Sequence, residues 1–176
     1  MVGVDTESEM IRYRPNVLRI IQIATFDAVL IYRMDRVSQE LVHLLTSDDV
    51  IKYTIGNDQT GLGKRFNVAV NAFVDIQPPA QRLMGLTHLP STQAMSDQYA
   101  AHLNYRKEKH LQMSQWGQWP LRTAQVEYAA KDALVALAIG CKLDQMIDLT
   151  GRTAPTSLEE LNRMTLNVRI IDTNKK

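Results

Sequence analysis

The chain has 176 residues, a formal net charge of +1, 45% apolar residues and 22% charged residues. These values predict one globular domain with its own core, and they exclude a strongly basic module that coats nucleic acid through bulk charge. No stretch has the length of a membrane span or the pattern of a signal segment, so no membrane partner is expected.

A single cysteine, Cys141, excludes an internal disulfide and a cysteine-rich zinc site. It falls within an apolar helical pattern, where we interpret it as a small core residue. A lone thiol fits a reducing compartment, so we expect an intracellular protein of the nucleus or cytoplasm.

The first predicted element is a strand over residues 2–7. Successive strand residues alternate between the two faces of a sheet, so Asp5 and Glu7 should project side by side. Two neighbouring carboxylates are costly unless they are solvated, share a proton or hold a hard cation. The apolar residues before Asp5 indicate a central strand whose end opens into a cleft.

Two more strands are predicted over residues 18–24 and 28–32 from their β-branched content, and with the first strand they form an antiparallel meander. The loop over residues 8–16 carries Arg12 and Arg14 close to the proposed site. Each arginine is interpreted either as a grip for substrate or as a solvated loop charge, and the sequence leaves both interpretations open.

Helical and extended patterns alternate after the meander, which predicts an α/β fold with a mixed sheet flanked by helices. The expected elements are a helix around 41–45, a strand over 50–55 parallel to the first, a helix over 58–66, a strand over 68–75, helices from about 79 and over 91–103, and a long helix over 123–147. We assign residues 1–150 to this domain and residues 151–176 to a C-terminal extension with a partly disordered tail.

Further acidic residues can reach the end of the first strand. Tyr128 and Asp132 are four residues apart on the long helix and so share one face, while Asp58 stands at a strand-to-helix transition. With Asp5 and Glu7 they form a set of four acids and one tyrosine. Converging carboxylates repel unless cations neutralise them, and two divalent ions about 3.5–4 Å apart form a clamp for phosphoryl chemistry. A set of oxygen ligands selects Mg²⁺ or Mn²⁺ over zinc.

These residues lie in three motifs that resemble those of a known family. The motifs are Asp5-x-Glu7, Asp58-Gln59 followed by Phe73-Val74-Asp75, and Ser114-x-Trp116-x-x-x-Pro120-Leu121-x-x-x-Gln125-x-x-Tyr128-Ala129-Ala130-x-Asp132. Together they resemble the DEDDy branch of 3′–5′ exonucleases, the ribonuclease D and Werner-exonuclease-like group, over residues 2 to about 147. The last motif is the specific one, because Asp-x-Glu alone is common.

The resemblance implies a ribonuclease-H-like fold and stepwise release of nucleoside monophosphates from the 3′ end of DNA or RNA. It implies that one ion, bound by Asp5, Glu7 and Asp132, activates water. The second ion, held by Asp5 and indirectly through Asp58, stabilises the leaving 3′ oxygen. The resemblance also implies that Tyr128 orients the water for in-line attack.

Four residues complete the predicted site as candidates for substrate binding. Lys109 matches a basic position of the family, Thr6 lies between the first two acids, and Arg12 and Arg14 come from the neighbouring loop. Thr60 stands where the Werner-like pattern has a tryptophan that touches the terminal nucleotide, which predicts weaker stacking on the last base.

Two functional interpretations remain from the sequence. The first is an active, metal-dependent 3′–5′ exonuclease, which the complete set of acids favours. The alternative is a catalytically inactive module of the same fold that binds nucleic acid or a protein partner. Trp116 and Trp119 are interpreted as core or loop anchors rather than as platforms for bases. The sequence leaves open both the oligomeric state and the choice between DNA and RNA.

Overall fold

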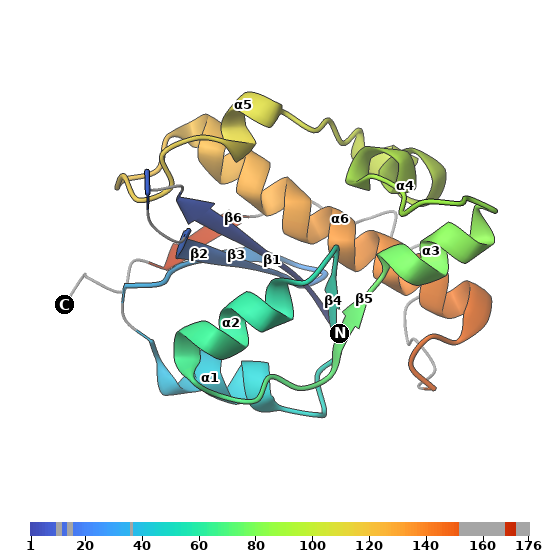
Figure 1. Ribbon diagram of the computed structural model, residues 1–176, viewed down its shortest axis with the longest axis horizontal. Helices are drawn as coiled ribbons and strands as arrows, with labels where there is room; N and C mark the ends of the chain where they lie inside the picture. Colours follow the sequence, from blue (N-terminus) through green and yellow to red (C-terminus); the bar gives the residue numbers. More distant parts are fainter. Residues whose placement is uncertain (10–11, 14–15, 36, 152–167, 172–176) are drawn as a thin grey trace.

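The computed structural model describes residues 1–9, 12–13, 16–35, 37–151 and 168–171. At its centre lies a six-stranded mixed sheet with the order β5-β4-β1-β2-β3-β6 (Figure 1). The strands are β1 (Val2–Glu9), β2 (Val17–Ala24), β3 (Val29–Arg33), β4 (Lys52–Thr54), β5 (Phe73–Asp75) and β6 (Val168–Ile171). The strand that carries the two acids is therefore an inner strand, as its apolar start predicts.

The pairing of the strands brings two predicted acidic segments to one edge of the sheet. β1, β2 and β3 form the predicted antiparallel meander. β4 lies on the other side of β1 and runs parallel to it, also as predicted, and β5 runs parallel to β4. Parallel neighbours end at the same edge of a sheet, so the segment that follows β4 lies beside the end of β1.

β6 is a strand that the sequence does not predict. It pairs in parallel with β3, so residues 168–171 of the expected C-terminal extension belong to the central sheet. Its residues Val168, Ile170 and Ile171 are β-branched and favour a strand, but the strand is short and its partner β3 is far away in the sequence. The remainder of the extension after Gly151, including the expected disordered tail, lies outside the described residues.

Helices cover both faces of the sheet. They are α1 (Gln39–Thr46), α2 (Asp58–Phe66), α3 (Gln77–Leu83), α4 (Thr92–Tyr99), α5 (Lys109–Gln112), α6 (Thr123–Ile147) and the 3-10 turn η1 (Ala101–Leu103). α6 crosses one face, and α1 and α2 lie against the other (Figure 1). The helix predicted over 91–103 is divided at Ala100, whose φ of −139° leaves the helical region. None of the described helices is long and apolar enough to span a bilayer.

The strand predicted over 68–75 is shorter than expected. Only Phe73–Asp75 pairs with β4. Before it, the backbone N–H of Asn71 donates a 3.0 Å hydrogen bond to the carbonyl oxygen of Leu45 in α1, and Ala72 has a positive φ of 52°. This conformation interrupts the extended backbone, so the apolar residues ahead of it pack as a loop.

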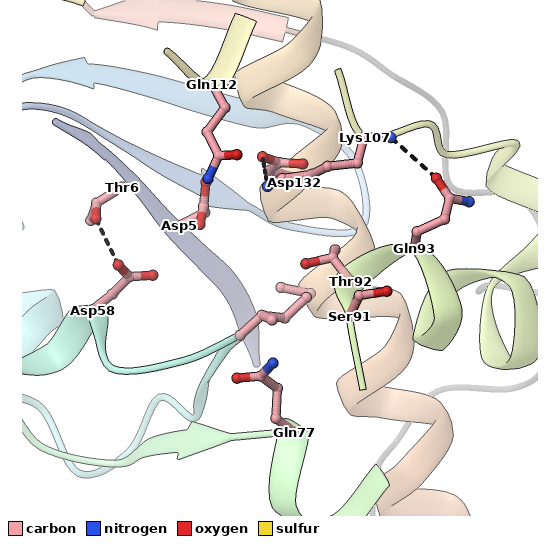
Figure 2. A pocket seen from close by; sticks show the side chains of 12 residues that line it. Asp5, Thr6, Asp58, Gln77, Ser91, Thr92, Gln93, Lys107, Gln112 and Asp132 are labelled. Carbon is pink, nitrogen blue, oxygen red and sulfur yellow. Dashed lines mark hydrogen bonds and ion pairs between the residues drawn. The ribbon is translucent and has the colours of Figure 1, made fainter. Parts of the chain in front are cut away.

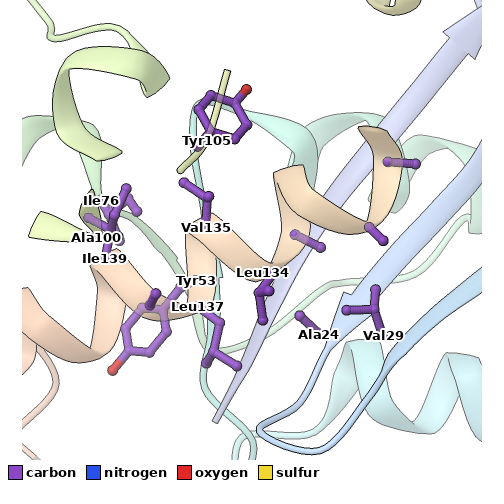
Figure 3. Packing of buried hydrophobic residues seen from close by; sticks show 14 of the residues in the cluster. Ala24, Val29, Tyr53, Ile76, Ala100, Tyr105, Leu134, Val135, Leu137 and Ile139 are labelled. Atoms are coloured by element: carbon purple, nitrogen blue, oxygen red, sulfur yellow. The ribbon is translucent and has the colours of Figure 1, made fainter. Parts of the chain in front are cut away.

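α6 packs closely against β1 and β2 and forms much of the core (Figure 3). Cys141 is buried in this helix, as predicted for a core residue. The closest approach is at Gly3, where a Cβ atom would collide with the backbone of Ala133 and Leu137. A glycine at this position therefore sets the short distance between β1 and α6 on which the site depends.

Candidate active site

β1 directs two carboxylates toward α6. Val4 packs in the apolar cluster beneath α1 and α2, so Asp5 and Glu7, which have the opposite parity in the strand, face the long helix. Beyond Glu7 the register with β2 shifts, because Glu7 pairs with Ile20 whereas Ser8 pairs with Leu18. Such an irregularity bends a strand and is frequent beside active sites.

Asp132 reaches the same point from α6. One carboxylate oxygen from each of Asp5, Glu7 and Asp132 lies within 4.8 Å of the other two. Glu7 and Asp132 expose only 6% and 5% of their surface, while Asp5 borders a cavity. The structure thus brings together three predicted ligands from two elements that are far apart in the sequence.

Asp58, the fourth predicted acid, is the first residue of α2. Its Oδ1 accepts a 2.8 Å hydrogen bond from the hydroxyl of Thr6, so β1 orients this carboxylate (Figure 2). Its Oδ2 is buried and has no hydrogen-bond partner among the described residues. The preceding turn is fixed by Asp75, whose Oδ1 accepts from the backbone N–H of Gly56 at 3.1 Å. A buried, unpartnered carboxylate oxygen is costly, and a cation would satisfy it.

Tyr105 is a member of the site that the sequence did not identify. Its hydroxyl donates a buried 2.6 Å hydrogen bond to Oδ1 of Asp132. The carbonyl oxygen of Tyr105 accepts from the side-chain amide of Gln93 at 3.0 Å, which anchors the segment to α4. Tyr105 lies in an irregular stretch between η1 and α5, where no periodicity distinguishes a buried residue from an exposed one.

Lys107 is the second residue whose role the sequence left unrecognised, although it belongs to the most basic stretch of the chain. Its Nζ lies 3.4 Å from Oδ2 of Asp132 and 5.5 Å from the centre of the Tyr128 ring. Its backbone N–H donates to Oε1 of Gln93 at 3.1 Å. Gln93 therefore bonds the backbone of both residues whose side chains contact Asp132.

Tyr128 is buried one helical turn before Asp132, as the four-residue spacing predicts. Its hydroxyl makes no hydrogen bond of good geometry among the described residues, although it lies close enough for the charges of Asp132 and Glu7 to raise its pKa further, beyond the effect of burial. The ring of Trp116 lies 6.1 Å from the Tyr128 ring, centre to centre. Trp116 is itself buried, in agreement with its interpretation as an anchor.

The start of α6 is fixed by Gln125. Its Oε1 accepts from the backbone N–H of Arg122 at 3.1 Å, and its Nε2 donates to the hydroxyl of Ser114 at 3.0 Å. The glutamine side chain thus caps the helix and ties it to the segment before it. This arrangement sets the rotation of α6, and hence the direction in which Tyr128 and Asp132 project.

Burial raises the pKa of all four acidic groups. Desolvation, followed by the charge of Asp132, raises the pKa of Glu7 from 4.5 to about 9. Desolvation also raises the pKa of Asp58 to about 6, in spite of the hydrogen bond from Thr6. The pKa values of Asp5 and Asp132 are raised too, again chiefly by desolvation. Such a cluster stays fully ionised near neutral pH only with added positive charge.

A cavity of about 520 Å³ opens beside the acids. Asp5, Asp58 and Asp132 line one side. Much of the remaining wall consists of uncharged groups that form hydrogen bonds, and these are Gln77, Ser91, Thr92, Gln93 and Gln112. Gln112 projects toward Asp5, whereas Gln77 and Thr92 lie at the opposite end (Figure 2). The cavity therefore joins an acidic end to a neutral, polar end.

Of the four candidate substrate-binding residues, only Thr6 contacts one of the acids in the described part of the chain. Thr6 contacts Asp58. Lys109 is exposed at the start of α5, two residues beyond the lysine that contacts Asp132. Arg12 is exposed, and its guanidinium lies 5.2 Å from the centre of the Tyr13 ring. Arg14 lies outside the described residues. Roles in substrate binding for these four residues stay predictions.

The chemistry of the donor set fits hard divalent cations. The clustered ligands are carboxylate oxygens, which Mg²⁺ and Mn²⁺ prefer, and no His or Cys of the described chain joins this cluster. Asp5, Glu7 and Asp132 would hold one ion. Asp58, with its unpartnered Oδ2, lies close enough to this cluster for its charge to raise the pKa of Asp5.

Comparison with known proteins gives matches in sequence and in structure. Residues 1–148 match the 3′-5′ exonuclease family. Exonuclease 3′-5′ domain-containing protein 2 of Drosophila melanogaster is 34% identical over 118 residues, which are 62% of this chain and 19% of that protein. The chain thus corresponds to about a fifth of that relative's length.

Two solved structures illustrate the likeness in fold. Escherichia coli RNase D, an exoribonuclease involved in structured RNA processing, has a TM-score of 0.71 at 19% identity, over 94% of this chain and 45% of that chain. Brucella melitensis NrnC bound to pGG has a TM-score of 0.68 at 21% identity, over 92% of this chain and 77% of that chain. These likenesses confirm the predicted ribonuclease-H-like fold with its mixed sheet and flanking helices. On the family match over residues 1–148, the chain belongs to the 3′–5′ exonuclease domain family.

Proposed function

We propose that the chain is an active 3′–5′ exonuclease of the DEDDy type, which uses two Mg²⁺ or Mn²⁺ ions to release nucleoside monophosphates from the 3′ end of DNA or RNA. One observation carries this proposal: Asp5, Glu7 and Asp132 place carboxylate oxygens within 4.8 Å of one another. A buried cluster of like charges is unfavourable for folding by itself. Its presence is explained if the acids bind cations that act in catalysis.

The acids divide into two sets by their positions. Asp5, Glu7 and Asp132 would hold one ion, and Asp5 with Asp58 the other. Two bound ions would supply the positive charge that lowers the pKa of water and stabilises the leaving 3′ oxygen. Two hydroxyl groups support the ligands. The hydroxyl of Tyr105 orients Asp132, and the hydroxyl of Thr6 orients Asp58.

Tyr128 is the group that would position the attacking water. Its hydroxyl is buried, has no other partner of good geometry among the described residues, and lies near Glu7 and Asp132. Its raised pKa keeps the hydroxyl protonated, so it can both donate and accept a hydrogen bond. A phenol held in this way can direct a water toward a phosphate that binds at the neighbouring acids.

The cavity is suited to the terminal nucleotide. Its volume of about 520 Å³ lies within the range of small-ligand sites. The acidic end would hold the scissile phosphate through the ions, and the neutral end offers amides and hydroxyls to a sugar and base. Relatives of the fold support a nucleic-acid substrate, since NrnC is known with pGG bound and RNase D is an exoribonuclease.

The proposal is tested by hydrolysis of 5′-labelled DNA and RNA oligonucleotides with Mg²⁺ or Mn²⁺. We expect a ladder of products, each shorter by one nucleotide, that disappears with EDTA. Asp132→Asn should abolish the ladder and leave the fold intact, because removing one buried charge relieves repulsion without opening a cavity.

A matched control is Asp27→Asn, which neutralises an exposed aspartate in the turn between β2 and β3. This variant should retain full activity, because Asp27 is not among the acids of the cluster. Binding of oligonucleotide without metal-dependent products, in the wild-type protein, would instead identify an inactive module of the same fold.

A further inference from the structure

The acidic cluster has a basic side chain beside it whose ammonium group has only long contacts, 3.4 Å to Oδ2 of Asp132 and 5.5 Å to the centre of the Tyr128 ring. Lys107 is anchored at its N–H by Gln93 and follows Tyr105, which is bonded to Asp132. By contrast, its side chain is 35% exposed, and the contact of its Nζ with Asp132 is long, at 3.4 Å. The ammonium group can therefore move while the backbone stays in place.

Lys107 is also the one basic residue among the described residues that line the cavity. Its positive charge lowers the pKa values of Asp5, Glu7, Asp58 and Asp132, against the larger raising effect of burial. It acts on all four acids at once. This lysine is thus the counter-ion that the protein itself supplies to the site.

The lysine and a divalent ion compete for the same oxygen atoms. Oδ1 of Asp132 already accepts from Tyr105, and Oδ2 faces Lys107. A cation shared by Asp132, Asp5 and Glu7 would need an oxygen of Asp132, and its charge would repel the ammonium. A bound ion would therefore displace Lys107 from Asp132 into the cavity that it lines.

A bound substrate would bring one type of anion into the cavity, the phosphate group. A phosphate of the strand at the acidic end would lie next to the displaced ammonium, and lysine binds phosphate oxygens as a mobile point charge. We propose that Lys107 is an exchangeable cation: it pairs with Asp132 until divalent ions bind, and it then contacts a non-bridging oxygen of the scissile phosphate. This inference rests on the proposed exonuclease function and adds a catalytic residue to it.

The proposal predicts two effects of opposite sign for Lys107→Met, which keeps the length of the side chain and removes its charge. The first is measured without any substrate, by titration of the EDTA-treated protein with Mn²⁺ and detection by electron paramagnetic resonance. Mn²⁺ should bind about fivefold more tightly to the variant, because no ammonium competes for Asp132.

The second effect concerns phosphate. In the presence of Ca²⁺, thymidine and uridine 5′-monophosphates carry the group that the scissile phosphate becomes after release. Calorimetry should show that Lys107→Met weakens their binding about tenfold, as expected for loss of one charged hydrogen bond. Lys107→Arg should recover much of this affinity. Thymidine and uridine without phosphate should bind equally to all variants.

The control is Lys131→Met, which removes an exposed lysine next to Asp132 in the sequence and should leave both affinities unchanged. Thermal unfolding of each variant shows whether it is folded. Unchanged Mn²⁺ affinity in Lys107→Met, or a loss of phosphate affinity in Lys109→Met instead, would overturn the exchange. Failure of the wild-type protein to bind Mn²⁺ would overturn the proposed function itself, which keeps the two failures distinct.

Discussion

Tyr105 donates a buried 2.6 Å hydrogen bond to Oδ1 of Asp132, 27 residues further along the chain. The bond connects an irregular segment to the face of α6 that carries the acidic cluster. A phenol carries no charge at neutral pH, so it fixes the direction of the carboxylate without neutralising it. The other oxygen of Asp132, Oδ2, is left to positive charge, and in the structure it faces the ammonium group of Lys107 at 3.4 Å.

We expect Tyr105→Phe to weaken both folding and metal binding. Loss of a hydrogen bond to a buried charged group should lower the free energy of unfolding by about 1.5–3 kcal/mol. The hydroxyl lowers the pKa of Asp132, so its removal raises that pKa and makes the aspartate harder to ionise. Urea unfolding and Mn²⁺ titration at pH 7 measure the two effects.

Tyr99→Phe is the control for this variant, since Tyr99 is a half-buried tyrosine at the end of α4 that lies outside the acidic cluster. Equal Mn²⁺ affinity in the two variants would show that Tyr105 has no part in the site.

The stability of the protein in EDTA should fall as the pH rises from 5 to 8. The pKa of Glu7 is about 9 in the folded protein and 4.5 ordinarily, and that of Asp58 is about 6 against 3.8. The folded chain therefore binds more protons than the unfolded chain in this window, so the free energy of unfolding decreases with pH, by about 2 kcal/mol or more.

Divalent ions should remove this dependence, because they favour the ionised acids in the folded state. Thermal unfolding at each pH, with EDTA or with Mn²⁺, gives both curves. Glu7→Gln, which cannot ionise, should flatten most of the slope in EDTA. A wild-type slope equal to that of Glu7→Gln would contradict the assignment of a high pKa to this residue.

Close contact between β1 and α6 should make Gly3→Ala strongly destabilising. The new Cβ would collide with the backbone of Ala133 and Leu137, so the strand and the helix must separate. We expect the free energy of unfolding to fall by about 3 kcal/mol. Mn²⁺ affinity should fall too, because Asp5 and Glu7 lie on β1 and Asp132 lies on α6.

Gly61→Ala provides the matched substitution. Gly61 is exposed in α2 and nothing lies within 4 Å of an added Cβ. Alanine favours helix over glycine by about 1 kcal/mol, so this variant should be more stable and bind Mn²⁺ normally. Normal Mn²⁺ affinity in Gly3→Ala as well would show that the spacing of β1 and α6 does not control the site.

Regular elements explain why much of the site is predictable from the sequence. Alternation along a strand places Asp5 and Glu7 on one face, and the helical repeat places Tyr128 above Asp132. Each pair depends only on local geometry. The meeting of the two pairs depends on the packing of α6 against β1 at Gly3, and from the sequence only the resemblance in motifs indicates it.

The parts that escaped prediction lie where no such repeat exists. Tyr105 and Lys107 stand in an irregular segment, whose direction is set by hydrogen bonds to Gln93 rather than by its own sequence. The resemblance to the family motif points to Lys109, whereas the structure places Lys107 at Asp132. β6 escaped for a related reason, since its pairing with β3 depends on a distant partner.

The most direct test of the account is a crystal structure of the protein soaked with Mn²⁺ and a nucleoside 5′-monophosphate, with anomalous scattering recorded to locate the ions. We predict two Mn²⁺ ions, one bound by Asp5, Glu7 and Asp132 and the other beside Asp5 and Asp58, with the phosphate between them and Lys107. Anomalous maps without an ion among Asp5, Glu7 and Asp132, in a crystal whose cavity holds the nucleotide, would contradict a metal-dependent mechanism at this site.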